Sequence, residues 1–585
     1  DAQESRGLGD VYKRQVLGVS GTVISEEDNL PVIGASVLVK GTNLGAITDI
    51  EGKFNILNVP SSAKSLVVSY VGMTSQEVKI SSKPVVVYLK SDSKLLDEVV
   101  ITGYGVTRKA AFTGSAQVVE SNDLRKRSDD NFLKSLEGSV AGFQMMNASG
   151  QPGAYASTTI RGTSSLNSGT EPLYVIDGVP MYTSNVLSYG ESESSALGVN
   201  PLANINAADI ESVTVLKDAT ATSIYGARAA NGVIVITTKR GKSGKAKVNL
   251  SMKYGRTFLG QMDDDYRMLG LAEYKEIWTE GIQNGFKAGN ISESVLSDMG
   301  MTGVDLSIPE NAAEFGRRWG IKYYNSDWDT CEDIDWFDQA IKNSSVQQYD
   351  LSVQGGNDNL AYFASLGYYQ NGGIVIGSGM KRYSGRLNLD AKSGIFKFGA
   401  SINISLSDVD QIPISSSYNN PMVLAYDTRP IQQIYNEDGS YAMVQDGDYN
   451  LVALYDKNTG DIHNQKTLIT ILNPYFSIDL MKGLVWKTNA GLTINQVNLF
   501  DFQGKNNPST YASGEYSTMV GSKSRYNTNT YSLTNTLNYI TSFNNRHNLN
   551  IMLGQEIQKL TIDKLAASAK GYPYSDTVSY THLRA

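Results

Sequence analysis

Hydrophobic and polar residues alternate along most of the second half of the chain. In residues 246–258, Val248, Leu250, Met252 and Tyr254 fall on one face of an extended strand and polar residues on the other. The alternation recurs at 346–355, 360–370, 382–391, 396–407, 468–480, 483–496, 531–542 and 549–558. It predicts about nine antiparallel strands, each of a length that crosses a bilayer when tilted.

The connections between these strands are alternately short and long. Tight turns are expected at 356–359, 392–394, 481–483 and 544–546, and long loops at about 258–344, 408–465 and 497–525. Short turns on one side and long loops on the other are typical of an outer-membrane β-barrel. A soluble sandwich is the second interpretation, but regular loop lengths would then be a coincidence.

Residues 16–91 contain shorter strands separated by turn residues. The strands are expected at 19–25, 34–42, 45–56, 65–72 and 84–90. This spacing predicts a small β-sandwich with Phe54 and Ile56 pointing into its core. The segment 21–56 resembles the carboxypeptidase-regulatory-like domain.

The resemblance to that domain does not extend to an enzyme. A zinc carboxypeptidase needs a His-x-x-Glu ligand pair, and His463, His547 and His582 all lack the glutamate. No nucleophile elbow, phosphate-binding loop or dinucleotide fingerprint is present either. Cys331 is the single cysteine, so no internal disulfide is possible. We expect no enzyme, no catalytic residue, no metal and no cofactor.

Residues 108–244 show a mixed helix and strand pattern. The segment 130–145 predicts a short amphipathic helix that ends at Gly138 or Gly142. The length of the region is typical of one compact α/β unit.

A hairpin and a strand–helix–strand unit follow in the same region. LYVIDGVPMY predicts a hairpin over an Asp177-Gly178 turn, with Pro180 confining its second strand to a sheet edge. Asp218 is expected to cap the next helix and Gly226 to end it. The strand VIVITT then reads as buried on both faces.

The segment LLDEVVITGYG, residues 95–105, has no obvious partner strand. Val99, Val100 and Ile101 favour a strand, yet a polar run precedes them and the basic pair Arg108 and Lys109 follows. Such a strand with flexible flanks is suited to pair with another protein.

This order of segments resembles the SusC/RagA family of TonB-linked outer-membrane transporters from about residue 16 to 574. The most specific motifs are LLDEVVITGYG, LYVIDGVP and SVTVLKDATATSIYGARAANGVIVITTKRG. The resemblance implies a mainly β protein. Its expected parts are an Ig-like sandwich at 16–91, a linker with a TonB box at 92–107, an α/β plug at 108–244 and the N-terminal part of a large transmembrane barrel at 245–577.

The two ends resemble translated adaptor sequence. We expect residues 1–15 and 578–585 not to belong to the protein, so a leader peptide cannot be judged from the start of the chain. The family barrel is longer than about nine strands, so the chain is expected to be a fragment.

The resemblance also implies site residues. The TonB box is expected at Asp97, Glu98, Val99, Val100, Ile101 and Thr102, where it would add as a strand to a TonB-like energy-transducing protein. The alternative is an ordinary first strand of the plug.

The plug motifs implied by the family are Arg161, Gly162, Asp177, Gly178 and Arg228. Arg161 and Arg228 are interpreted as latches to carboxylates of the barrel lumen. The alternative is that these arginines satisfy backbone carbonyls.

The implied function is import of a glycan or peptide oligomer across the outer membrane of a Gram-negative bacterium. The bacterium is expected to belong to the Bacteroidota. A SusD-like surface lipoprotein and outer-membrane lipid are the other implied partners, and the sandwich, linker and box lie on the periplasmic side. The alternative function is a TonB-dependent receptor for an iron chelate or cobalamin. An adhesin would fit the strands but not the box.

Two remaining features concern charge. The net charge of −8 argues against nucleic acid as a partner. The acidic cluster Asp263, Asp264 and Asp265 is interpreted as a solvated turn rather than a calcium site, because the EF-hand spacing is missing.

Overall fold

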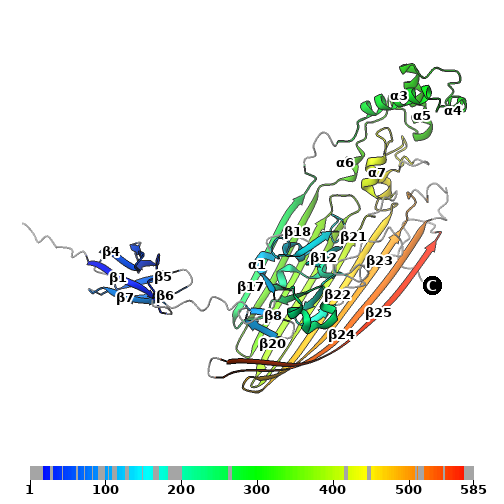
Figure 1. Ribbon diagram of the computed structural model, residues 1–585. Coiled ribbons are helices and arrows are strands. Elements are labelled where there is room, and N and C mark those ends of the chain that lie inside the picture. Colours follow the sequence, from blue (N-terminus) through cyan, green and yellow to red (C-terminus); the bar gives the residue numbers. More distant parts are fainter. Residues whose placement is uncertain are drawn as a thin grey trace, which may run out of the picture. The chain divides into compact units, whose positions relative to one another are not determined.

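The computed structural model forms two compact units, Asp1–Val100 with Val106–Phe112 and Ile101–Gly105 with Thr113–Ala585 (Figure 1). It describes residues 17–571 except 27–29, 43, 61–62, 71–72, 82, 90–98, 103–104, 109–114, 125–130, 148, 163–169, 182–200, 261–266, 414–418, 444–448, 508–509, 511–518 and 544–546. The adaptor-like ends, the acidic cluster at 263–265, and Asp97 and Glu98 therefore lie outside the described residues.

The first unit contains a sandwich of two sheets. One sheet has the order β4 (Lys53–Val59), β1 (Leu17–Ser25) and β7 (Val85–Leu89), and the other has the order β3 (Gly45–Ile47), β2 (Ser36–Val39), β5 (Ser65–Tyr70) and β6 (Met73–Lys79). Val23, Val37 and Leu66 are fully buried between them, and Phe54 and Ile56 point inward as predicted. Strand β6 was not predicted because its sequence MTSQEVK is mostly polar, as suits an edge strand.

The second unit begins with a five-stranded sheet. Its order is β10 (Ala116–Glu120), β15 (Ile210–Leu216), β16 (Val233–Thr238), β13 (Leu173–Ile176) and β14 (Val179–Met181), with β13 and β16 parallel. Strand β16 is buried along nearly its whole length, and β14 with Pro180 lies at the edge, so both predictions are confirmed. A separate hairpin pairs β11 (Phe143–Asn147) with β12 (Ala156–Ile160).

The amphipathic helix predicted within 130–145 is wrong in its length. A short 3-10 helix, η2 (Phe132–Ser135), is followed by turns with Gly138 and Gly142 at positive φ, and β11 begins at Phe143. The apolar residues of this segment point into the core of the plug from a turn and a strand, so the spacing of a compact irregular segment was mistaken for a helical period.

The predicted cap of the next helix is confirmed. The Asp218 side chain accepts a hydrogen bond of 2.8 Å from the Ala221 amide at the start of α2 (Ala219–Thr222). Gly226, at φ 66°, interrupts the 3-10 helix η6 (Ser223–Ala229) that follows. The other short helices of the region are α1 (Ser121–Leu124), η4 (Pro201–Asn204) and η5 (Ala207–Asp209).

A nine-stranded antiparallel sheet, in which every strand pairs with the next in sequence, makes up the rest of the unit. The strands are β17 (Gly244–Thr257), β18 (Ser344–Gly356), β19 (Leu360–Gly372), β20 (Gly379–Ser393), β21 (Phe396–Asp410), β22 (Ile462–Met481), β23 (Leu484–Phe502), β24 (Val520–Phe543) and β25 (His547–Lys570). The mainly β fold class and the nine strands are confirmed. We call this sheet the wall and residues 115–243 the plug.

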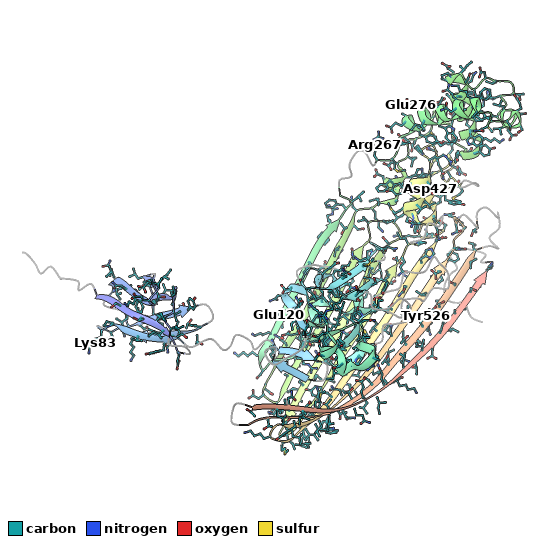
Figure 2. The ribbon with its side chains drawn as sticks, viewed as in Figure 1. Lys83, Glu120, Arg267, Glu276, Asp427 and Tyr526 are labelled. Carbon is teal, nitrogen blue, oxygen red and sulfur yellow. The ribbon has the colours of Figure 1, made fainter. Side chains whose placement is uncertain are left out.

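The long connections of the wall carry helices that the sequence analysis missed. The first holds α3 (Leu271–Lys287), α4 (Glu293–Asp298), α5 (Pro309–Tyr324) and α6 (Trp336–Ala340), and the second holds α7 (Pro421–Asp427) and α8 (Leu451–Leu454). Arg267 and Glu276 in the first and Asp427 in the second mark these loops in Figure 2. Among the described residues, no helix has the length and hydropathy needed to cross a membrane.

The two helical loops are fastened to each other. The Arg429 guanidinium lies 5.2 Å from the ring centre of Tyr324 and 6.0 Å from that of Trp278, and the Trp336 indole donates to the Arg429 carbonyl at 3.1 Å. Ile431 packs into the same cluster. The two loops therefore pack into one surface at one end of the wall, and the tight turns lie at the other end.

Candidate functional site

The hairpin between β13 and β14 presents an acid to the wall. Asp177 and Gly178 both have positive φ, 48° and 87°, which is the geometry of the tight hairpin turn that the Asp-Gly pair predicts. The Asp177 carboxylate accepts bonds from the Thr238 amide at 3.0 Å and from the Thr238 hydroxyl at 2.7 Å. The turn thus fixes the carboxylate beside the end of β16.

A wall arginine completes this contact. The Arg386 guanidinium of β20 donates to Asp177 at 2.7 Å, and both side chains are only 2% exposed. Arg386 also donates to the hydroxyls of Thr238 and, at 2.8 Å, Ser401. An ion pair so far from water is expensive to form, but its position is well defined because separating the partners leaves a buried charge.

A second group of contacts joins the wall to the segment that contains η4 and η5. The Asn206 amide donates to Asp350 at 2.6 Å, and the Ser365 hydroxyl donates to Asp209 at 2.6 Å. Arg382 of β20 donates to the Ala203 carbonyl. These contacts use side chains from three neighbouring wall strands, so the segment is held along a line across the wall.

The Asp209 carboxyl is buried at this contact between plug and wall. Burial raises the pKa of Asp209, the bond from Ser365 and the charge of Arg386 oppose that rise, and the charge of Asp350 adds to it. Burial outweighs the bond and the arginine, so Asp209 favours its neutral form more than an exposed aspartate does.

A third contact lies at the tight-turn end of the wall. Arg240, just after β16, pairs with Asp390 at 2.7 Å, and the Tyr475 hydroxyl donates to the same carboxylate at 2.7 Å. The Arg240 side chain is 39% exposed. An ion pair with this access to water contributes little to stability, about 0–1 kcal/mol.

The two arginines interpreted as latches behave differently. Arg228 pairs with Glu556 of β25 at 2.6 Å, which agrees with a contact to a wall carboxylate. Arg161 has φ 61°, and its amide donates to the Gly142 carbonyl at 2.7 Å. Among the described residues no wall carboxylate pairs with Arg161, so its latch interpretation is not supported.

The strand of the proposed TonB box has a local partner. Val99–Thr102 forms β8, which makes a two-stranded sheet with β9 (Gly105–Arg108). The expectation that this strand has no neighbour in sequence is therefore wrong, because the partner lies after it rather than before it. A two-stranded sheet still has an open edge on each strand.

The wall residues of the site were not predicted. Arg386, Asp350 and Ser365 lie on strands whose outward faces were recognised, while their inward polar residues looked like ordinary solvent-facing positions. Charge was the signal that could have identified Arg386 as a site residue, because an arginine in the middle of a strand is unusual on a solvated face of a short sheet. Among the described residues no cluster of three or more potential metal ligands occurs.

Comparisons with known proteins give consistent results. Residues 108–233 match the TonB-dependent receptor plug domain, and residues 19–101 match the CarboxypepD_reg-like domain. TonB-dependent receptor P3 of Formosa agariphila is 30% identical over an aligned region of 588 positions. This region covers 98% of this chain and 51% of the relative. TonB-dependent receptor SusC of Bacteroides thetaiotaomicron is 35% identical over 384 residues, 65% of this chain and 32% of the relative.

A solved structure is also similar. The RagAB peptide importer in the closed-closed state has 27% sequence identity and a TM-score of 0.62, covering 80% of this chain and 50% of that chain. This chain spans about half the length of P3 and of the RagAB chain.

Replacing Arg386 with methionine is expected to weaken the attachment of the plug by about 3–5 kcal/mol, because Asp177 is left buried without its partner. Arg240→Met, which removes the more exposed pair, is the matched control and should cost about 0–1 kcal/mol. Protease cleavage of the plug as a function of urea measures both. The double variant Arg386→Met/Asp177→Asn should recover part of the loss, because asparagine tolerates the positive φ, can still accept from Thr238 and carries no charge. Equal shifts for the two single variants would contradict the assignment.

Asp209 gives a pH prediction. Its pKa is raised in the attached state, so attachment takes up a proton and becomes stronger as the pH falls through the raised pKa towards the ordinary range of an aspartate. This contribution is lost as the pH rises through the raised pKa. Asp209→Asn should attach at neutral pH at least as well as the unmodified protein and show a smaller pH dependence in the same urea assay. Glu276→Gln, at an exposed loop position, is the control; an unchanged pH dependence in Asp209→Asn would rule Asp209 out as its source.

Proposed function

Since the chain belongs to the SusC/RagA-type TonB-dependent receptors, we propose that it imports an oligomeric nutrient across the outer membrane of a Gram-negative bacterium. The activity is that of the intact receptor, because this chain spans about half the length of its relatives. The observation that supports this proposal most directly is that buried polar contacts around Asp177 and Arg386 hold the plug against the inner face of the wall. A receptor of this family transports its ligand and does not transform it.

The character of the plug–wall contacts supports a plug that is stable but releasable. Many of the contacts described are hydrogen bonds and ion pairs. Apolar contacts are present as well: Ile469 and Ile471 of the wall join the apolar core of the plug, and Tyr369, Met380 and Val409 of the wall pack with Ala203. Polar groups that separate can bond to water, which enters a barrel lumen, whereas an apolar contact loses its full burial. A force that pulls on the plug would therefore meet a high activation barrier. The difference in free energy between the attached and the released plug would nevertheless be small.

The end of the plug lies near the tight turns. Gly244 at the start of β17 pairs with Gly356, next to the turn at 357–359. In the proposed orientation these turns face the periplasm, which puts the chain leading out of the plug on the side where an energy-transducing protein works.

The strand β8 is the proposed contact of that protein. A TonB-like partner would add its own strand to the open edge of β8 or replace β9. Main-chain hydrogen bonds carry such pairing, so Val99, Val100 and Ile101 are proposed to contribute strand shape rather than specific chemistry.

The helical loops are proposed to meet a SusD-like surface lipoprotein that delivers the substrate. The two loops pack into one surface, joined by Arg429 and Ile431, at the end of the wall opposite the tight turns. The substrate is proposed to be a peptide or a glycan oligomer. The similarity to an importer of peptides, RagAB, supports a substrate of that size but does not choose between the two.

Uptake of labelled oligomers tests the function. Cells that make the intact receptor and its lipoprotein should accumulate labelled peptides or oligosaccharides, and a proton uncoupler should stop accumulation. Accumulation of an iron chelate or cobalamin in place of both oligomers would overturn the proposal.

Val99→Pro tests the box within this account. Proline removes the amide hydrogen and resists strand pairing, so we expect uptake to fall to the level with uncoupler while the amount of receptor in the outer membrane stays the same. Val99→Thr keeps the amide hydrogen and the branched shape and should keep uptake. Normal uptake by the proline variant would place the partner contact elsewhere.

A further inference from the structure

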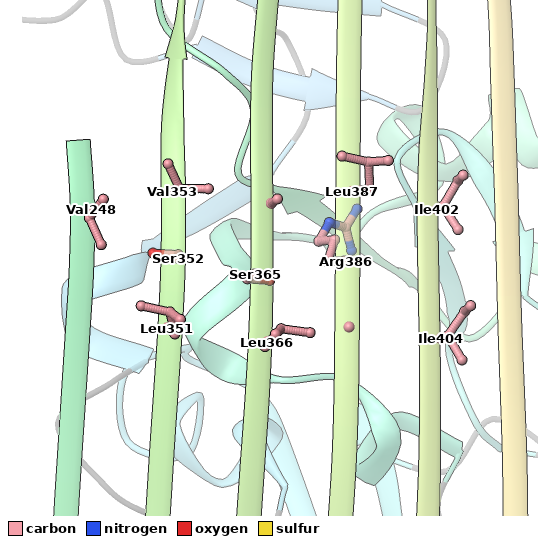
Figure 3. A pocket seen from close by; sticks show the side chains of 12 residues that line it. Val248, Leu351, Ser352, Val353, Ser365, Leu366, Arg386, Leu387, Ile402 and Ile404 are labelled. Carbon is pink, nitrogen blue, oxygen red and sulfur yellow. The ribbon is translucent and has the colours of Figure 1, made fainter. Parts of the chain in front are cut away.

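A group of polar side chains lies in the middle of two neighbouring wall strands. Arg386 of β20 lies beside Leu387 of the same strand and Ile402 of β21 (Figure 3). Leu387 is partly exposed on the outward face, whereas the Arg386 side chain is buried on the inward face. Ser401 and Asn403 flank Ile402 in the sequence and therefore share the inward face with Arg386, and Asn403 lies directly opposite it.

Asp177 of the plug uses only part of what this group offers. Its carboxylate accepts one bond of 2.7 Å from the Nη2 atom of Arg386 and one of 3.3 Å from the Ser401 hydroxyl. Within the part of the chain that the structure describes, Nε of Arg386 and both amide atoms of Asn403 have no hydrogen-bond partner, although they are shielded from solvent. The wall therefore holds more donors for an anion than Asp177 fills.

The unused donors are a cost while the plug is attached. A buried polar group without a partner destabilises a structure by about 1–3 kcal/mol. Asn403 is 3% exposed, and an apolar side chain of the same size would avoid this cost. The attached plug alone therefore does not account for an asparagine at this position, and a second state in which its amide is bonded would do so.

The donors are arranged for a carboxylate that is free to turn. A carboxylate has about four acceptor positions, and a guanidinium binds it most strongly through two parallel bonds. Asp177 is held by its tight turn and by Thr238, and it takes a bond from only one guanidinium nitrogen. A carboxylate outside the turn can accept from both Nε and Nη2 of Arg386 and from the Asn403 amide.

The other acids of the plug–wall contact already have partners of their own. Ser365 donates to Asp209, Asn206 and Gln348 donate to Asp350, and Arg240 and Tyr475 donate to Asp390. Among the described residues, Asp177 is the one carboxylate that pairs with Arg386. Departure of the plug therefore leaves the Arg386 guanidinium in the lumen without its counter-ion.

We propose that Arg386, Ser401 and Asn403 form a carboxylate-binding site of the wall. Asp177 occupies this site while the plug is attached, and a carboxylate of the imported oligomer occupies it when the plug leaves. The inference rests on the proposed function and narrows the substrate to an oligomer that carries a carboxylate, at the end of a peptide or on an acidic sugar. Such a substrate favours the released plug, because it binds the wall only in that state.

Acetate tests the site, because it is an aspartate side chain without the backbone. In the intact receptor, Asp177→Gly keeps the positive φ of the turn and leaves the space of the side chain free. Protease cleavage of the plug at a fixed urea concentration should become faster, since Arg386 loses its partner. Sodium acetate at about four times its dissociation constant should slow this cleavage about fivefold. Sodium chloride and neutral acetamide at the same concentration should not.

The unmodified receptor should respond in the opposite direction. There acetate competes with Asp177 and binds the wall only after the plug has left, so it should speed cleavage about fivefold at the same degree of saturation. A general effect of salt would act in the same direction on both proteins and would overturn the proposal. Acetate without any effect on the unmodified receptor would overturn it as well, even where Asp177→Gly does not assemble.

Asn403→Leu tests the composition of the site. The substitution removes no bond of the attached plug, but it should reduce the acetate effect on the otherwise unmodified receptor from about fivefold to less than about twofold. Ser407→Ala is the matched control, because Ser407 is also buried without a partner on the inward face of β21 but lies opposite Arg382. Equal acetate effects in the two variants would contradict the site, as would rescue by acetate in Asp177→Gly/Arg386→Met.

Uptake of matched oligomers identifies the source of the carboxylate. One pair is a labelled peptide with a free carboxyl end and the same peptide with an amide end, and the other is an oligosaccharide of glucuronate units and one of glucose units. The unmodified receptor should take up the carboxylate member of one pair about tenfold faster than its neutral partner, and Asn403→Leu should lose most of this preference. Equal uptake within both pairs would overturn the proposal.

The two assays separate this inference from the proposed function. If acetate acts in opposite directions on the unmodified receptor and Asp177→Gly but none of the four oligomers is taken up, the proposed function fails and the carboxylate site stands. If oligomers are taken up and acetate changes cleavage in neither protein, only the carboxylate site fails.

Discussion

The buried ion pair between Arg386 and Asp177 is the contact on which the arrangement of plug and wall depends. Each partner is 2% exposed, and each would be left as an isolated buried charge if the plug moved by a few ångströms. The tight turn at Asp177 and Gly178 fixes the acid, and the pairing of β20 with β21 brings Ser401 to the arginine. The pair therefore defines one position of the plug rather than adding general stability.

The rest of the plug–wall contact follows from the same constraint. Because the inner face of the wall carries many buried polar side chains, the plug must present polar groups to them, and Asn206, Asp209 and Arg240 do so. Such groups exchange their partners for water at modest net cost. An apolar inner face would hold the plug more permanently and would also bind poorly hydrated substrates. The outward face obeys the opposite rule, with apolar rows between two sets of aromatic residues.

The sequence predicted those parts of the fold that rest on periodicity. The alternation from Val248 onward revealed the wall, and the Asp-Gly turn and the Asp218 cap were correctly placed because local backbone chemistry decides them. The helix expected within 130–145 was wrong because the apolar residues of this segment belong to a turn and a strand. The helices of the first long loop were missed because loop length, and not helical period, was used to interpret that segment. Arg386 and Asp350 could not be assigned, since only the three-dimensional pairing shows which plug residue faces each wall strand.

Transport as proposed requires the plug to leave the wall, and a reversible tether between the two tests this requirement most directly. A Cβ on Gly491 would lie 2.6 Å from the Val179 side chain, so cysteines at these two positions bring plug and wall within reach of a disulfide. Cys331, the cysteine of this chain, and any cysteine in the rest of the receptor are first replaced by serine. In the intact receptor, oligomer uptake by Val179→Cys/Gly491→Cys should stop on oxidation and return on reduction, while each single cysteine variant is unaffected by either treatment. Undiminished uptake with the disulfide formed would contradict the account.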